Sequence, residues 1–290
     1  MLKKTRFYTH TEALTALFVL GQAEIFINSK NTVLGFLTAF LSGVAVIAVS
    51  SFITKKASNI KNAPLKKTVC TILLFSVCVY SAFCFSKAFL FFLKFSKAII
   101  LKEASYFSLG IIFSAVLLYF SFKRQEDILK FSIIAIWGVL GITVIFAVLL
   151  FPSFNAENLV ILPFDLNGIG ETASHYLKSA FLPCVLLGFY ENEVFGKAKT
   201  GALIKGLLLG GALLGFCVIC PILIFGNVFS QISEYPFSLA ISTVQFGKLF
   251  SRLDMLSFLM LFISALIKCA VCLFLSFASL KRMSKILKSQ

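Results

Sequence analysis

Residues 225–268 read FGNVFSQISEYPFSLAISTVQFGKLFSRLDMLSFLMLFISALIK and connect two long apolar runs of the chain. The connection holds a Tyr-Pro pair, a short amphipathic piece and the charged residues Arg252 and Asp254. The run that follows is apolar except for one charge, Lys268. A charged side chain inside a membrane-spanning helix costs free energy and is usually kept for a function. Lys268 is therefore the first candidate functional residue.

The composition of the 290 residues is that of an integral membrane protein. Hydrophobic residues make up 59% and charged residues 13%, whereas a soluble domain has roughly 45–50% apolar and about 25% charged residues. Apolar runs of about 20 residues recur, which indicates spanning helices. We expect an all-α polytopic membrane protein, one transmembrane domain over residues 1–290. Its eight predicted helices lie at about 11–28, 33–53, 68–93, 104–122, 129–151, 172–190, 203–225 and 253–280.

The net charge of +15 lies mostly in the loops between these runs. Of the 27 Lys and Arg residues, 18 fall on the side that holds the N-terminus and 7 on the other. Because cytoplasmic loops carry the excess of positive charge, both termini are predicted to be cytoplasmic. This placement argues against nucleic acid as a partner. It also puts the amphipathic piece, residues 236–250, on the outer surface of the membrane, with Arg252 and Asp254 at the entry of the eighth helix.

Two of the predicted helices carry signals of an interruption. The first run contains Gly21, Gln22 and Glu24, and an acidic residue there is costly unless it lies near the outer interface or faces a polar cavity. The sixth run contains Pro183 and, five residues later, Gly188. Since proline removes a backbone hydrogen bond, the sixth helix is predicted to be kinked or broken.

The two lysines inside spans differ in depth. Lys268 lies about 15 residues into the last run, or ~22 Å along a helix that rises ~1.5 Å per residue. That is too deep for easy snorkelling, so we expect it to face the bundle, with Glu24 or a carbonyl of a broken helix as its partner. Lys178 lies only about two turns into the sixth run and can reach the headgroups.

No enzymatic chemistry is predicted. The eight cysteines all lie in apolar runs, and the two pairs with CxxC spacing have no neighbouring histidine or carboxylate. Packing, rather than metal binding or redox chemistry, is their expected role. The chain has two histidines and no recognisable pair of nucleophile and base. We therefore expect no catalytic residue, no metal and no cofactor.

An ordered series of short motifs runs from about residue 104 to 275. The motifs are a basic turn ending in Arg124, Asn158-Leu159, Pro163, Asn167-Gly168-Ile169, Phe225-Gly226, Tyr235-Pro236, Ser251-Arg252-Leu253-Asp254 and Lys268. In their order and spacing they resemble the spore germination permeases. These are the B subunits of germinant receptors, within the amino acid–polyamine–organocation transporter superfamily.

The resemblance implies a fold of ten helices in two inverted five-helix repeats, with discontinuous first and sixth helices that hold the substrate between them. The chain carries the first eight helices, so the resemblance implies an incomplete inverted-repeat (5+5) fold that is truncated after the eighth. The implied ligand-binding residues are Gly21, Gln22, Glu24, Pro183, Leu187, Gly188 and Lys268.

The implied function is that of a permease-like subunit of a spore germinant receptor in the spore inner membrane. It would bind a small nutrient such as an amino acid, with Glu24 pairing the ligand ammonium. Its partners would be a soluble-domain membrane subunit and a lipoprotein. Two alternatives remain open: a secondary transporter of amino acids or ions, coupled to cations through Glu24 or Lys268, and a degenerate structural subunit that binds nothing. Truncation weighs against the transporter, because alternating access needs a complete scaffold.

Overall fold

The computed structural model describes residues 2–21, 31–58, 63–99, 103–121, 125–159, 165–189, 200–232, 235–243 and 253–288. Within these ranges the regular elements are helices, and no strand occurs. The α-helices are α1 (Leu2–Leu20), α2 (Thr32–Ser58), α3 (Ala63–Ile99), α4 (Tyr106–Ser121), α5 (Gln125–Leu150), α6 (Leu166–Tyr176), α8 (Thr200–Ile232), α9 (Pro236–Ser242) and α10 (Asp254–Lys288). The described part of the chain is all-α, as predicted.

Five apolar helical segments are long enough to cross a bilayer. They are Thr32–Ser50, Thr68–Ile99, Asp127–Ser153, Thr200–Gly226 and Met255–Ile286. Two shorter apolar helical segments are His10–Leu20 and Tyr106–Phe120. These helices are those of a multi-pass membrane protein. The longest are α3 with 37 residues and α10 with 35, and both continue past the predicted apolar runs.

The end of α1 and the break of the sixth helix lie where the sequence indicates interruptions. α1 ends at Leu20, and Gly21 stands in a turn whose N–H donates to Leu17 O at 2.9 Å. Residues 22–28 of the predicted first helix lie outside the described residues. The sixth helix begins as α6, where the Asp165 side chain accepts a hydrogen bond from the Asn167 N–H at 3.1 Å. It continues as a π-helical turn, η3 (Leu177–Phe181), a 3-10 turn, η4 (Leu182–Cys184), and α-helical residues 185–189.

The connection before α10 differs from the prediction. Only seven residues of the expected amphipathic piece, 236–250, are helical in the described part, as α9, and residues 244–252 lie outside the described ranges. Five of these seven are buried, and the Phe237 ring contacts Phe146 of α5 and Phe216 of α8 with centroids 6.0 and 6.2 Å apart. The prediction of a surface helix was wrong for α9, because a short uncharged helix with apolar residues on all sides is stabilised by burial.

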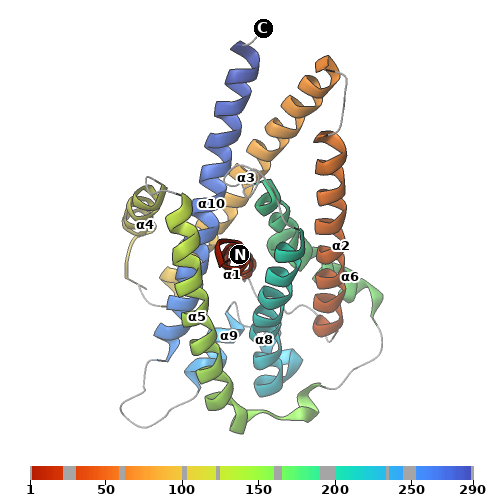
Figure 1. Ribbon diagram of the computed structural model, residues 1–290. Helices are drawn as coiled ribbons and strands as arrows, with labels where there is room; N and C mark the ends of the chain where they lie inside the picture. Colours follow the sequence, from red (N-terminus) through yellow and green to blue (C-terminus); the bar gives the residue numbers. More distant parts are fainter. Residues whose placement is uncertain are drawn as a thin grey trace.

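Helix α1 lies in the middle of the bundle, with α5 and α10 on one side of it and α8 and α2 on the other (Figure 1). Residues 13–20 of α1 are at most 3% exposed. Glycines of α8 allow this close packing. A Cβ on Gly206 would lie 2.6 Å from Glu12 O, and one on Gly210 would lie 2.9 Å from Ala16 Cα. The two backbones therefore touch, as at small-residue contacts between membrane helices.

A second glycine contact joins α2 to the sixth helix. A Cβ on Gly35 would lie 2.6 Å from Thr172 Cβ of α6, and one on Gly43 would lie 2.7 Å from Phe181 Cβ of η3. The Phe181 ring also packs edge-on against Phe40 of α2, with centroids 5.7 Å apart. These contacts hold α6 and the π-helical turn η3 against α2.

Candidate functional site

Lys268 is the centre of the candidate site. Its side chain is 0% exposed, which makes it one of the largest fully buried side chains in the described part of the protein. Its Nζ donates a hydrogen bond to the backbone carbonyl of Ser179, at 3.0 Å, and lies 5.2 Å from the centroid of the Phe18 ring of α1. The bundle-facing position was predicted, and the burial of Lys268 confirms it. Of the two predicted partners, Glu24 or a carbonyl of a broken helix, the structure shows the carbonyl.

The break in the sixth helix explains why the Ser179 carbonyl is available. In a continuous α-helix this carbonyl would accept from the N–H of the residue four positions later. That residue is Pro183, which has no N–H. The chain responds with a π-helical turn, in which the Leu182 N–H donates to Leu177 O, five residues back. Lys268 supplies the donor that Pro183 lacks, so the proline and the lysine act on the same carbonyl.

The end of α1 reaches the same place. A Cβ on Gly21 would lie 2.5 Å from Ser264 O and 2.8 Å from Lys268 Cβ, both on α10. Only glycine permits so close an approach of α1 to α10. The end of α1 and the break at Pro183 therefore meet at one buried lysine.

Thiol groups form much of the surroundings of Lys268. Cys84 of α3, Cys184 of η4, and Cys269 and Cys272 of α10 lie close enough to its ammonium to interact electrostatically. All four thiols are free and buried. Among the described residues no three His, Cys, Asp or Glu side chains are arranged to hold a metal ion. These cysteines therefore supply small, polarisable side chains that pack around the lysine.

Two further polar groups are buried nearby. The hydroxyl of Ser179, a residue only 7% exposed, has no hydrogen-bond partner in the described structure. The Tyr80 hydroxyl of α3 is also buried and lies beside the Cys84 thiol. Since buried polar groups are nearly always paired with protein, water or a ligand, this unmatched hydrogen-bonding capacity distinguishes the region from ordinary core.

No described carboxylate neutralises Lys268. The ion pairs described are Lys130–Asp127 at 3.7 Å and Lys205–Glu12 at 4.0 Å, both of them with exposed lysines. Glu24, the predicted acidic partner, and Gln22 lie outside the described residues, so their roles stay predictions.

The remaining predicted site residues, Leu187 and Gly188, lie in the second half of the sixth helix and pack against its neighbours. Leu187 is fully buried in the apolar core, and a Cβ on Gly188 would lie 3.9 Å from Leu203 Cδ1 of α8. Lys178, expected to snorkel, is exposed. Sequence reasoning missed Ser179 and the thiols. A signal for Ser179 exists, because the carbonyl four residues before a proline always lacks its helical donor.

Two of the motif residues also meet, at the far end of α8. Gly226 interrupts α8 with a φ of +75°, and the Asn158 side chain donates to Leu223 O at 2.9 Å and to Ile224 O at 3.3 Å. The Ser230 hydroxyl donates to Gly226 O at 2.7 Å. Asn158 thus replaces helical donors that the interruption removes, which is a structural role.

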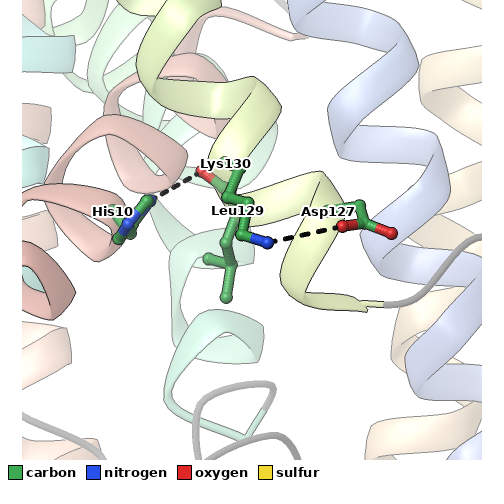
Figure 2. Close-up of polar contacts among 4 residues, drawn as sticks. All are labelled: His10, Asp127, Leu129 and Lys130. Atoms are coloured by element: carbon green, nitrogen blue, oxygen red, sulfur yellow. Dashed lines mark hydrogen bonds and ion pairs between the residues drawn. The ribbon is translucent and has the colours of Figure 1, made fainter.

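The first half of α1 is attached to α5. Figure 2 shows His10 pointing to α5, where its Nδ1 lies 3.1 Å from Leu129 O, next to the Lys130–Asp127 pair. The Ser132 hydroxyl donates to the same carbonyl at 2.7 Å. His10 therefore positions α1 in the bundle.

The chain matches no protein-family model and no curated protein. Fold and site together define a class: an all-α membrane protein of several spans with a buried lysine where the end of one helix meets the break of another.

Proposed function

We propose that the chain is a permease-like subunit of a spore germinant receptor, which binds a small nutrient such as an amino acid. The observation that carries the proposal is the meeting, at Lys268, of the end of α1 with the break of the sixth helix. Helix ends and breaks expose backbone groups and helix-end dipoles inside the membrane, and transporters use such places to hold polar substrates. The Ser179 carbonyl is a group of this kind, and the Lys268 ammonium lies against it.

Reciprocal packing of the helices supports an inverted repeat of five helices. α8 contains the seventh predicted helix. In such a repeat the first helix corresponds to the sixth, and the second helix corresponds to the seventh. The contact of α1 with α8 then corresponds to the contact of α6 with α2. Both contacts occur, and both are made through glycines of the partner helix. Along α8, Gly206 and Gly210 meet Glu12 and Ala16. Residue numbers increase along both helices from one contact to the next, so α1 and α8 run in the same direction.

The second contact has the same form. Along α2, Gly35 and Gly43 meet Thr172 and Phe181 of the sixth helix, again in ascending order. α3 and α10 contain the third and eighth predicted helices, and they pack against each other. Such a repeat relates these two helices to each other, so their contact is its own counterpart. The five long spans, the two shorter apolar helices and the interrupted sixth helix together fit eight crossings of the membrane.

The proposed orientation puts both termini in the cytoplasm and the chain in the spore inner membrane. Figure 1 shows the end of α2, the start of α3 and the C-terminus of α10 at one end of the bundle. At that end Lys281, Arg282 and Lys285 of α10 are exposed, in keeping with the positive charge of cytoplasmic loops. The proposed partners are a soluble-domain membrane subunit and a lipoprotein.

The test compares two lysines of the membrane-spanning part. Lys268→Met and Lys178→Met variants are expressed with the partner subunits in spores that lack other receptors, and nutrient-triggered loss of spore optical density is recorded. We expect replacement of the buried Lys268 to impair the nutrient response, and replacement of the exposed Lys178 to leave it unchanged. An at least tenfold higher nutrient requirement in Lys268→Met alone supports the proposal, and the reverse order contradicts it.

Proteoliposomes separate the receptor from the transporter alternative. The purified chain, without partner subunits, is expected to give no uptake of labelled amino acids. Robust uptake would instead favour a secondary transporter that works alone.

A further inference from the structure

Positive charge gathers without negative charge at one end of the bundle. Residues 51–70 hold five lysines, residues 277–290 hold three lysines and one arginine, and neither stretch contains Asp or Glu. α2 ends and α3 begins within the first stretch, and α10 ends within the second. Figure 1 shows these three helix ends at the same end of the bundle. We call the two stretches together the basic end.

Two other basic stretches that the charge count places on the same side of the membrane are mixed. Residues 123–130 and 191–205 each contain two acidic residues, and Lys130 lies 3.7 Å from Asp127. Acidic residues contribute little to the orientation of a membrane protein, so orientation alone does not explain why the basic end has none. Attraction of an anionic partner does explain it, because every acidic residue there would weaken the attraction.

The exposed face of α10 changes from apolar to basic at the basic end. Phe277 and Leu280 are 65% and 51% exposed, and Lys281 and Lys285 are exposed as well. Phe277, Lys281 and Lys285 follow at intervals of four residues and so share one side of the helix. Along the helix Lys281 lies ~6 Å and Lys285 ~12 Å beyond Phe277. The headgroup layer of a bilayer is about 5–8 Å thick on each side, so a phenylalanine among the acyl chains puts the two lysines at the headgroups.

We infer that the basic end binds anionic phospholipids, with one headgroup phosphate held between Lys281 and Lys285 and the acyl chains against Phe277. Side chains four residues apart on a helix have Cβ atoms ~5–6 Å apart, so both ammonium groups can donate to one phosphate. A lipid covers both parts of this face, whereas an acidic protein segment would leave Phe277 and Leu280 exposed. Clusters of Lys and Arg next to a membrane-spanning helix bind anionic lipids in this way.

The test measures which lipid lies beside residue 277. The chain has one tryptophan, Trp137 of α5, which is 70% exposed. The full chain with Trp137→Phe and Phe277→Trp carries its only tryptophan at the basic end. It is reconstituted in phosphatidylcholine vesicles with a small fraction of phosphatidylglycerol whose acyl chains carry bromine, which quenches tryptophan fluorescence on contact. The unchanged chain, with its tryptophan on α5, reports the lipid that surrounds another part of the bundle.

We expect phosphatidylglycerol to be preferred over phosphatidylcholine about fivefold beside residue 277, and not beside Trp137. Lys281→Gln combined with Lys285→Gln should abolish the preference, and so should about 1 M salt, because salt screens exposed charges. Lys178→Gln replaces an exposed lysine of the sixth helix and should leave the preference unchanged. Equal quenching at the two positions overturns the inference and leaves the basic end to an acidic protein partner. A preference that survives the double substitution overturns the assignment to these lysines. Neither result bears on nutrient binding, which the spore assay tests separately.

Discussion

Replacing Gly21 with alanine tests the contact that brings α1 to the candidate site. The added Cβ would lie 2.5 Å from Ser264 O and 2.8 Å from Lys268 Cβ. The first neighbour is backbone and the second is the stem of a buried side chain, so neither can turn aside. α1 must therefore move away from α10 by several tenths of an ångström or more.

The size of the effect follows from the packing. Overfilling a close-packed contact typically costs about 1–3 kcal/mol, and α1 is buried along residues 13–20, so its movement disturbs its contacts with α5 and α8 as well. One kcal/mol shifts the melting temperature of a domain of 150–250 residues by about 2–4 °C. We expect Gly21→Ala to melt several degrees below the unchanged protein.

Two glycines of α5 provide matched controls for the melting experiment. A Cβ on Gly138 or Gly141 meets nothing within 4 Å, and alanine is favoured over glycine in a helix by about 0.5–1 kcal/mol. These variants are expected to melt at the same temperature or slightly higher. If Gly21→Ala melts with the controls, α1 does not end against α10 and the site described here is wrong.

Three further substitutions follow from the same contacts. Pro183→Ala restores the N–H that Ser179 O lacks, so the bond to Lys268 should weaken and the nutrient response should fall, while thermal stability is kept or raised; a stable variant with a full response would contradict this. Asn158→Ala removes the side-chain donor from Ile224 O and one of the two donors of Leu223 O, which keeps the Asn155 N–H; the free energy of unfolding should fall by about 1 kcal/mol in a melting experiment. Gly210→Leu should separate α1 from α8 and unfold more easily than Gly201→Leu, since position 201 has nothing within 4 Å; equal stability would argue against the packing.

The parts of the fold that depend on local rules could be predicted from the sequence. The lengths of the apolar runs predicted membrane helices, and the interruption at Pro183 follows from a missing backbone N–H, which is a property of the proline itself. The depth of Lys268 in its run excluded easy snorkelling, and its burial agrees with that reasoning. Each of these conclusions needs only one segment of chain.

The parts that depend on contacts between distant segments could not be predicted. The approach of Gly21 to α10 and the thiols from three elements around Lys268 depend on how whole helices pack. α9 shows the opposite error. Its seven residues were assigned to an amphipathic surface piece, 236–250, but five of them are buried in the bundle.

The length of α10 has a mechanical consequence. Its 35 residues span about 52 Å at 1.5 Å per residue, compared with about 30 Å for the hydrocarbon core of a bilayer. Lys268 stands near the middle of this rod, and Lys285 is ~25 Å further along it. A tilt of about 5° at Lys268 would displace the basic tip by roughly 2 Å, a shift of the size seen when helices move at subunit interfaces. α10 can therefore act as a lever that carries an event inside the membrane to its surface, without any solute crossing.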